Sequence, residues 1–160
     1  YFRTPESEGQ AIQHESFRWH IDLARELDKT LVIHDRDSHD DVISVLLEQG
    51  APTRVVFHCF SGDADMARVC AEHGWFMSFA GVITFGSAEG LREALRTVPD
   101  DLLLVETDAP YLTPKPNRGR VNATYLMPWT VRRMAEERGV DVEKLCDDIV
   151  ANTHRAFGQW

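Results

Sequence analysis

Short apolar runs that recur about every 25 residues constrain the fold of this 160-residue chain more than any other feature of its sequence. The runs are brief, mostly apolar and clearly bounded, which is typical of strands buried on both faces of a sheet. They are TLVIH (30–34), RVVFH (54–58), WFMSFAG (75–81) and DLLLVETD (101–108). Strands repeated at this interval, with room for a helix between each pair, predict parallel βα units.

Segments with helical spacing of apolar residues fill the gaps between these runs. A stripe that includes Phe17 and Ile21 predicts a helix before the first strand, and a Pro-rich loop over 109–121 follows the last one. The other predicted helices cover 39–49, 63–73, 88–98, 122–138, 142–151 and 153–158.

The connections between these strands determine where a ligand would bind. Right-handed crossover connections make all the strands parallel, so their carboxyl ends lie on one edge of the sheet. That edge is where α/β folds bind their ligands. An open doubly wound sheet and a (β/α)8 barrel both fit, and the barrel takes about 250 residues. Four strands amount to half a barrel, with two exposed sheet edges. If the fold is a barrel, its first half is missing or is supplied by another chain.

Polar side chains end three of these runs, at the edge where a ligand is expected. His34 and His58 each follow three apolar residues, and Asp108 ends the last run. Each one alone is also common as a hydrogen-bonding or turn residue. Imidazole and carboxylate groups together predict a divalent metal site, in which Asp108 ligates the metal or takes a proton from water. We expect Glu106 and Asp108 to point to opposite sides of the strand.

A locally basic loop follows Asp108. The segment TPKPNRGR over 113–120 contains Lys115, Arg118 and Arg120, although the chain carries a net charge of −9. Arginine favours phosphate recognition because its planar fork binds two oxygens at once, whereas an ordinary solvated loop is the alternative. Arg36, two residues after His34, is a further candidate for the same substrate.

The loop HCFSGDADMA leads from the second strand into a helix. We expect Ser61 or Asp63 to cap that helix, with binding of a phosphate oxygen at the same helix terminus as the alternative. Cys59 beside His58 is expected to be a small buried residue and not a nucleophile.

Composition limits the class of protein. A hydrophobic fraction of 43% with 27% charged residues is typical of soluble globular chains. The negative net charge argues against a protein that coats duplex DNA or anionic lipid. No apolar run approaches the roughly 18 residues of a membrane span, so we expect no membrane partner. Three cysteines without paired spacing, and no signal peptide, predict a reducing, cytoplasmic location.

Five motifs in this order resemble the TatD family of metal-dependent hydrolases. They are VIHDRD, VFHCFSG, GVITF, VETDAPYLTPKPNRGRVN and NTHRAFG. The resemblance covers nearly the whole chain from about residue 13. It implies a TIM-barrel-type fold with a divalent metal (Mg, Mn or Zn) at the carboxyl rim. On this basis residues 1–160 form a single domain, the C-terminal portion of a (β/α)8 barrel with about four βα units.

The resemblance also implies roles for individual residues. His34, His58 and Asp108 match metal ligands, with Asp108 also catalytic, and Arg118 and Asn122 match a segment of the pattern RGxxN that we expect to bind substrate. The family's opening His-x-His motif and an upstream Glu ligand have no counterpart in this sequence.

These features together predict a TatD-type deoxyribonuclease that cleaves phosphodiester bonds at DNA ends or in single strands. Two alternatives remain open: a metal-dependent hydrolase of amide, ester or lactone bonds, and an inactive half barrel that needs a partner. The expected partners are DNA and, over the exposed sheet edges, either a second copy of the chain in a homo-oligomer or a missing N-terminal half.

Overall fold

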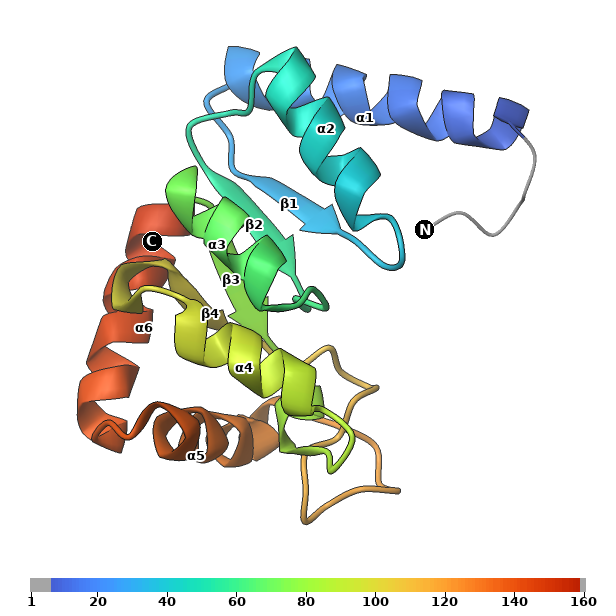
Figure 1. The fold of residues 1–160 in the computed structure, drawn as a ribbon. Helices are drawn as coiled ribbons and strands as arrows, with labels where there is room; N and C mark the ends of the chain where they lie inside the picture. Colours follow the sequence, from blue (N-terminus) through green and yellow to red (C-terminus); the bar gives the residue numbers. More distant parts are fainter. Residues whose placement is uncertain (1–6, 159–160) are drawn as a thin grey trace.

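Helices and strands alternate along the chain, and the computed structural model describes residues 7–158 (Figure 1). The strands are β1 (Leu31–His34), β2 (Val55–His58), β3 (Phe76–Phe79) and β4 (Leu103–Val105). The α-helices are α1 (Ser7–Glu26), α2 (His39–Gln49), α3 (Ala64–Glu72), α4 (Glu89–Thr97), α5 (Met127–Arg138) and α6 (Val142–Phe157). Short 3-10 helices are η1 (Gly81–Thr84), η2 (Asp100–Leu102) and η3 (Thr124–Leu126).

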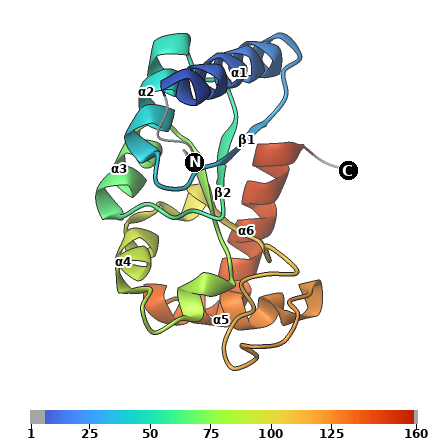
Figure 2. The ribbon, with the colours of Figure 1, turned by 90° about the vertical axis from the view of Figure 1, so that its right-hand side faces the viewer.

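The strands form one parallel sheet in the order in which they occur in the chain, β1-β2-β3-β4. The connecting helices α2, α3 and α4 lie on one face of this sheet together with α1 (Figures 1 and 2). A doubly wound sheet would instead carry helices on both faces around a point where the strand order reverses. The observed arrangement is the winding of a (β/α) barrel, with four strands present.

The main core lies between the sheet and helices α1 to α4. Alternate strand residues point into it because side chains of a strand alternate between its two faces. Ile33, Phe57, Met77 and Leu103 are each at most 4% exposed there. Apolar residues of the helices, such as Leu46, pack against them and close this side of the sheet.

The opposite face of the sheet is covered only in part. Val56, Phe76 and Leu104 form a smaller cluster there with Ala156 of α6. Helix α6 lies over this face (Figure 2) and contacts β4 (Figure 1), whereas Val32 in the edge strand β1 is 52% exposed. Among residues 7–158, no helix combines the length and apolar character needed to cross a membrane.

Some predicted boundaries need correction. The third run leaves the sheet at Phe79, and Gly81 begins η1, while only Leu103–Val105 of the fourth run form a strand. The two helices predicted over 142–151 and 153–158 are one continuous helix, α6. The division was wrong because the helix continues through Asn152, whose side chain donates to the carbonyls of Asp100 and Leu103 at 2.7 Å.

Candidate metal centre

Three side chains that can ligate a metal meet at the carboxyl edge of the sheet. His58 is the last residue of β2, and Glu106 and Asp108 follow β4. His58 Nδ1 lies 2.7 Å from Glu106 Oε1, and His58 Nε2 lies 3.5 Å from Asp108 Oδ1. One ligand atom from each residue lies within 4.8 Å of the other two. Each nitrogen of a single imidazole therefore faces a carboxylate.

The alternation of strand residues explains why Glu106 reaches His58. Val56 and Leu104 belong to the cluster beneath α6, and each lies two residues before a member of the site. Since residues two apart in a strand share a face, His58 and Glu106 continue that same face past the ends of β2 and β4. Asp108 reaches the imidazole from a turn, where its backbone adopts the left-handed region with φ of +55°.

The prediction that Glu106 and Asp108 point to opposite sides was wrong. Positions two apart share a face while the strand lasts, and β4 already ends at Val105. Reasoning from the sequence therefore missed Glu106 as a site residue. Its spacing from Leu104, a buried residue of the same run, is the signal that would have identified it.

His34 lies at the same edge but outside this cluster. It ends β1 and is in register with His58, and the centres of the two rings are 5.8 Å apart. The side chain is exposed and borders a pocket of about 610 Å³ between α1 and α2. The structure therefore gathers His34, His58 and Asp108 at one rim and brings two of them within ligand distance of each other. Their ligand roles remain predictions.

One oxygen of Glu106 shows that the donor set fits a cation. Glu106 Oε1 is buried, and its approach to His58 Nδ1 lacks hydrogen-bond geometry, so no described residue donates a hydrogen bond to it. A buried polar group without a partner costs about 1–3 kcal/mol. A divalent cation among these groups would remove that cost, and one imidazole with two carboxylates suits Mg, Mn or Zn.

The thiol of Cys59, next to His58 in the chain, has a raised pKa. Burial, with the negative charges of Glu106 and Asp108, raises the pKa of Cys59 to about 12. The thiolate is the form that attacks carbon or phosphorus and ligates metals. At neutral pH the thiol is therefore protonated, which agrees with the prediction that Cys59 is not a nucleophile, although the residue is half-buried and not buried as predicted.

Hydrogen bonds connect the loops that follow β1 and β2. Asp35 is 5% exposed, and its carboxylate accepts from Ser38 Oγ at 3.0 Å and contacts His39 Nδ1. Its backbone carbonyl accepts from Ser61 Oγ of the next loop at 3.0 Å. Asp63 accepts from two amides in the first turn of α3, so its predicted capping role is confirmed. Ser61 joins the two loops.

The arginines predicted to bind phosphate, Arg36, Arg118 and Arg120, are all exposed. The guanidinium carbon of Arg118 lies 3.9 Å from the centre of the Phe85 ring. Arg36 Nε lies 3.7 Å from Asp37 Oδ2, in a pair whose two side chains are largely solvent-exposed. The substrate roles of these arginines remain predictions.

Asn122, predicted to bind substrate, is instead committed to the shape of the loop. Its side chain is 4% exposed and donates to the carbonyls of Thr107 at 2.7 Å and Tyr111 at 2.6 Å. Both amide protons are thus already used inside the loop. The structure places Asn122 beneath the turn that contains Asp108, where it fixes the loop backbone.

Comparisons with known proteins identify the family of this chain. The model of the family described as TatD related DNase matches residues 2–158. The uncharacterized metal-dependent hydrolase TatD of Mycobacterium tuberculosis is 48% identical over 147 residues, covering 92% of this chain and 56% of that protein. The uncharacterized metal-dependent hydrolase YcfH of Escherichia coli K12 is 41% identical over 158 residues, covering 98% and 59%.

Solved structures share the fold. The crystal structure of YjjV, a TatD homolog from Escherichia coli K12, superposes with a TM-score of 0.81 at 26% identity, covering 88% of this chain and 54% of that one. A TatD-family hydrolase from Entamoeba histolytica gives a TM-score of 0.77 at 16% identity, covering 98% and 59%. The chain thus spans somewhat more than half the length of the proteins it matches.

Proposed function

This chain belongs to the family of TatD-related DNases, and from that premise we propose that it is a metal-dependent hydrolase that cleaves phosphodiester bonds at DNA ends or in single strands. The observation that carries the proposal is the cluster of His58, Glu106 and Asp108, in which a buried carboxylate oxygen has no hydrogen-bond donor among the described residues. The relatives named as metal-dependent hydrolases support the metal-dependent hydrolase class of this proposal.

In this proposal His58, Glu106 and Asp108 hold a divalent metal, and His34 is a further candidate ligand at the same rim. When bound, such a metal polarises a phosphoryl oxygen and lowers the pKa of water. The site lies at the carboxyl edge of a parallel sheet, which is where enzymes of this architecture carry their chemistry.

The protein's own groups then perform the positioning and the proton transfer. Asp108 orients the attacking water and accepts its proton. The water oxygen bonds to phosphorus as the bond from phosphorus to the leaving oxygen breaks, and that oxygen takes a proton from solvent. Arg118 binds a non-bridging phosphate oxygen through its planar fork, with Arg36 as a second candidate.

The distribution of charge favours ends and single strands as substrates. The body of the protein is acidic, and a basic loop with Lys115, Arg118 and Arg120 follows Asp108. A long duplex would bring many phosphates against the acidic surface, whereas a strand end brings few. Contacts to phosphate carry no base information, so we expect little sequence preference.

Replacing Asp108 with Asn tests the proposal, because the amide keeps the size of the side chain and removes its charge and its ability to take a proton. We expect kcat on a single-stranded oligodeoxynucleotide to fall at least about 100-fold. Bound metal per chain, measured by mass spectrometry, should fall as well. Asp148→Asn, on α6 beside Lys144, is the matched control and should leave both unchanged.

Two results would contradict the proposal. Wild-type turnover in Asp108→Asn would remove Asp108 from the chemistry. Hydrolysis of small carboxylic esters or lactones faster than of any phosphodiester, measured in parallel, would favour the other class of metal-dependent hydrolase.

A further inference from the structure

We propose that Phe85 is a positioning residue for Arg118 and that the buried Arg92 holds Phe85 in place. The inference rests on the proposed function, since it concerns the arginine to which we assign phosphate binding. Phe85 and Arg92 touch neither the metal ligands nor the reacting atoms in this assignment. They would set the affinity for the phosphodiester and leave the chemical step unchanged.

An aromatic ring, and not a carboxylate, holds Arg118. The guanidinium carbon lies 3.9 Å from the centre of the half-buried Phe85 ring, and within residues 7–158 no carboxylate pairs with this arginine. Other arginines of this acidic chain do pair with carboxylates, as Arg96 does with Glu89 and Glu137. A ring face fixes the guanidinium plane while the N–H donors within that plane stay available to a phosphate.

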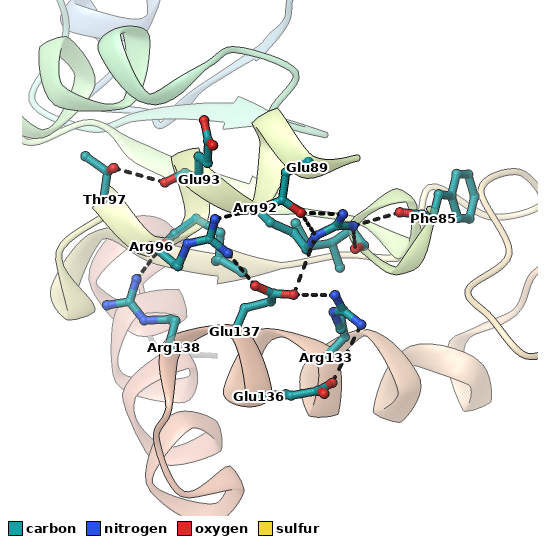
Figure 3. Close-up of polar contacts among 12 residues, drawn as sticks. Phe85, Glu89, Arg92, Glu93, Arg96, Thr97, Arg133, Glu136, Glu137 and Arg138 are labelled. Carbon is teal, nitrogen blue, oxygen red and sulfur yellow. Dashed lines mark hydrogen bonds and ion pairs between the residues drawn. The ribbon is translucent and has the colours of Figure 1, made fainter. Parts of the chain in front are cut away.

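Phe85 directly follows η1, and we call residues 81–85 the η1 platform. Arg92 of α4 holds the end of this platform (Figure 3): its Nη1 donates to Phe85 O at 2.7 Å and to Ile83 O at 3.3 Å. The carboxylate of Glu89 accepts from Arg92 at 2.7 and 3.0 Å. Glu137 Oε1 lies 3.5 Å from Arg92 Nε. The Arg92 side chain is only 7% exposed, so these partners both neutralise it and fix its direction.

The same charges join the η1 platform to α5. Glu137, whose side chain is 12% exposed, also pairs with Arg96 of α4 and Arg133 of α5 (Figure 3). Isolated ion pairs at a surface contribute little, but a connected and partly buried set holds its members in one geometry. Helices α4 and α5 therefore hold the η1 platform between them.

The loop that carries Arg118 rests on the η1 platform as well. Thr84 Oγ1 accepts from the amide of Lys115 at 2.8 Å and donates to Gly81 O at 2.7 Å. A Cβ at position 81 would lie 2.1 Å from Leu112 O, so the loop backbone packs directly against the platform. Both the backbone of this loop and the side chain of Arg118 are thus placed by one rigid element.

The test is a double-mutant cycle on the affinity of the metal-loaded protein for a phosphorothioate oligothymidylate that resists cleavage. Phe85→Leu removes the ring face, and we expect Kd to rise about two- to five-fold, as loss of an exposed cation–π contact implies. KM for the cleavable oligonucleotide should rise in parallel, with kcat and bound metal unchanged. Arg118→Ala should weaken binding at least as much, and Phe85→Leu should add nothing in that background.

Three further variants sharpen the test. Phe85→Tyr keeps the ring and should keep the wild-type Kd. Trp129→Leu is the matched control, because it removes the ring of another arginine–aromatic pair, with Arg132 at 5.5 Å, and should leave Kd unchanged. Arg92→Lys keeps the charge but loses the guanidinium, whose Nη1 donates to both carbonyls while its Nε and Nη2 bind Glu89, so it should raise Kd in the same direction as Phe85→Leu.

The outcomes separate this inference from the proposed function. A wild-type Kd in Phe85→Leu beside a weakened Arg118→Ala overturns the positioning role alone. An undiminished effect of Phe85→Leu in the Arg118→Ala background overturns it too, because Phe85 would then act independently of Arg118. A wild-type protein that binds the oligonucleotide but cleaves none contradicts the proposed function, while the cycle on Kd still decides the inference.

Discussion

At Gly81 the backbone of the loop after β4 approaches the η1 platform so closely that a side chain has no room. A Cβ there would lie 2.1 Å from Leu112 O and 3.0 Å from Pro114 N, and both are backbone atoms that cannot move alone. This loop can therefore pack against position 81 only because glycine has no Cβ. The position of the loop depends on this glycine as well as on the hydrogen bonds of Thr84 and Asn122.

Gly81→Ala should displace this loop. We expect a loss of about 1–3 kcal/mol in the free energy of unfolding, as for other overpacked sites, measured by urea denaturation. Affinity for the oligonucleotide should fall with it. Gly90→Ala is the control, because nothing lies within 4 Å of its Cβ and alanine suits helix α4; it should stabilise the protein by up to about 1 kcal/mol. A neutral Gly81→Ala would show that the loop is not seated in this way.

The site residues differ in how well the sequence indicates them. His34, His58 and Asp108 end apolar runs, and parallel strands bring such ends to one edge, so their shared rim followed from the sequence. Glu106 was missed because its role depends on the face of the strand it shares with Leu104. The buried Asn122 was assigned to substrate because a motif names residue types and not the direction of an amide.

At the scale of elements, the side-chain amide of Asn152 links α6 to the start of β4. Asn152 is 1% exposed, and its Nδ2 donates to Asp100 O and Leu103 O, both at 2.7 Å. Its Oδ1 accepts from Arg155 Nη2 at 2.6 Å. This side chain therefore joins α6, which covers part of the sheet face opposite α1 to α4, to the strand that leads to Glu106.

Asn152→Ala should remove the hydrogen-bond donor to the carbonyls of Asp100 and Leu103. We expect the free energy of unfolding to fall by about 1–3 kcal/mol, measured by urea denaturation. Asp147→Ala on the exposed side of α6 should change it by less than about 0.5 kcal/mol. Equal stability of the two variants would mean that α6 is held by its apolar contacts alone.

Most of the elements could be predicted from their apolar patterns. A strand buried on both faces gives a continuous apolar run, and a helix packed on the sheet gives a stripe of apolar residues at helical spacing. All four strands and helices α2 to α4 lie within a few residues of their predicted ranges. The turns at the carboxyl edge could not be predicted. Asp37, Cys59 and Asp108 adopt positive φ, and although aspartate is enriched at positive φ, only a few per cent of residues other than glycine adopt it, so these positions could not be identified. Long-range contacts such as those of Asn152 leave no local pattern either.

At the scale of the whole molecule, the chain combines a net charge of −9 with a basic loop over 113–120. The loop cations Lys115, Arg118 and Arg120 are all exposed. Binding of a nucleic acid strand would then depend on few charge contacts, because the remaining surface repels phosphate.

The salt dependence of binding should therefore be shallow. For two or three phosphate contacts to a single strand, the slope of log K against log salt should lie between about −1.4 and −2.1. Titration by fluorescence anisotropy over a range of NaCl concentrations measures it, and Lys115→Ala should reduce the slope by about 0.7. A slope steeper than about −3 would require phosphate contacts outside this loop.

The parallel sheet also places the site residues and the turns that can vary in length at opposite edges. His58, Glu106 and Asp108 lie at one edge, so the turns that lead from helix into strand, such as 50–54 between α2 and β2, lie at the other. Extra residues inserted at 50–54 would enlarge the protein away from its chemistry. The turns at one edge of the sheet can therefore vary in length while the site residues at the other edge keep their spacing.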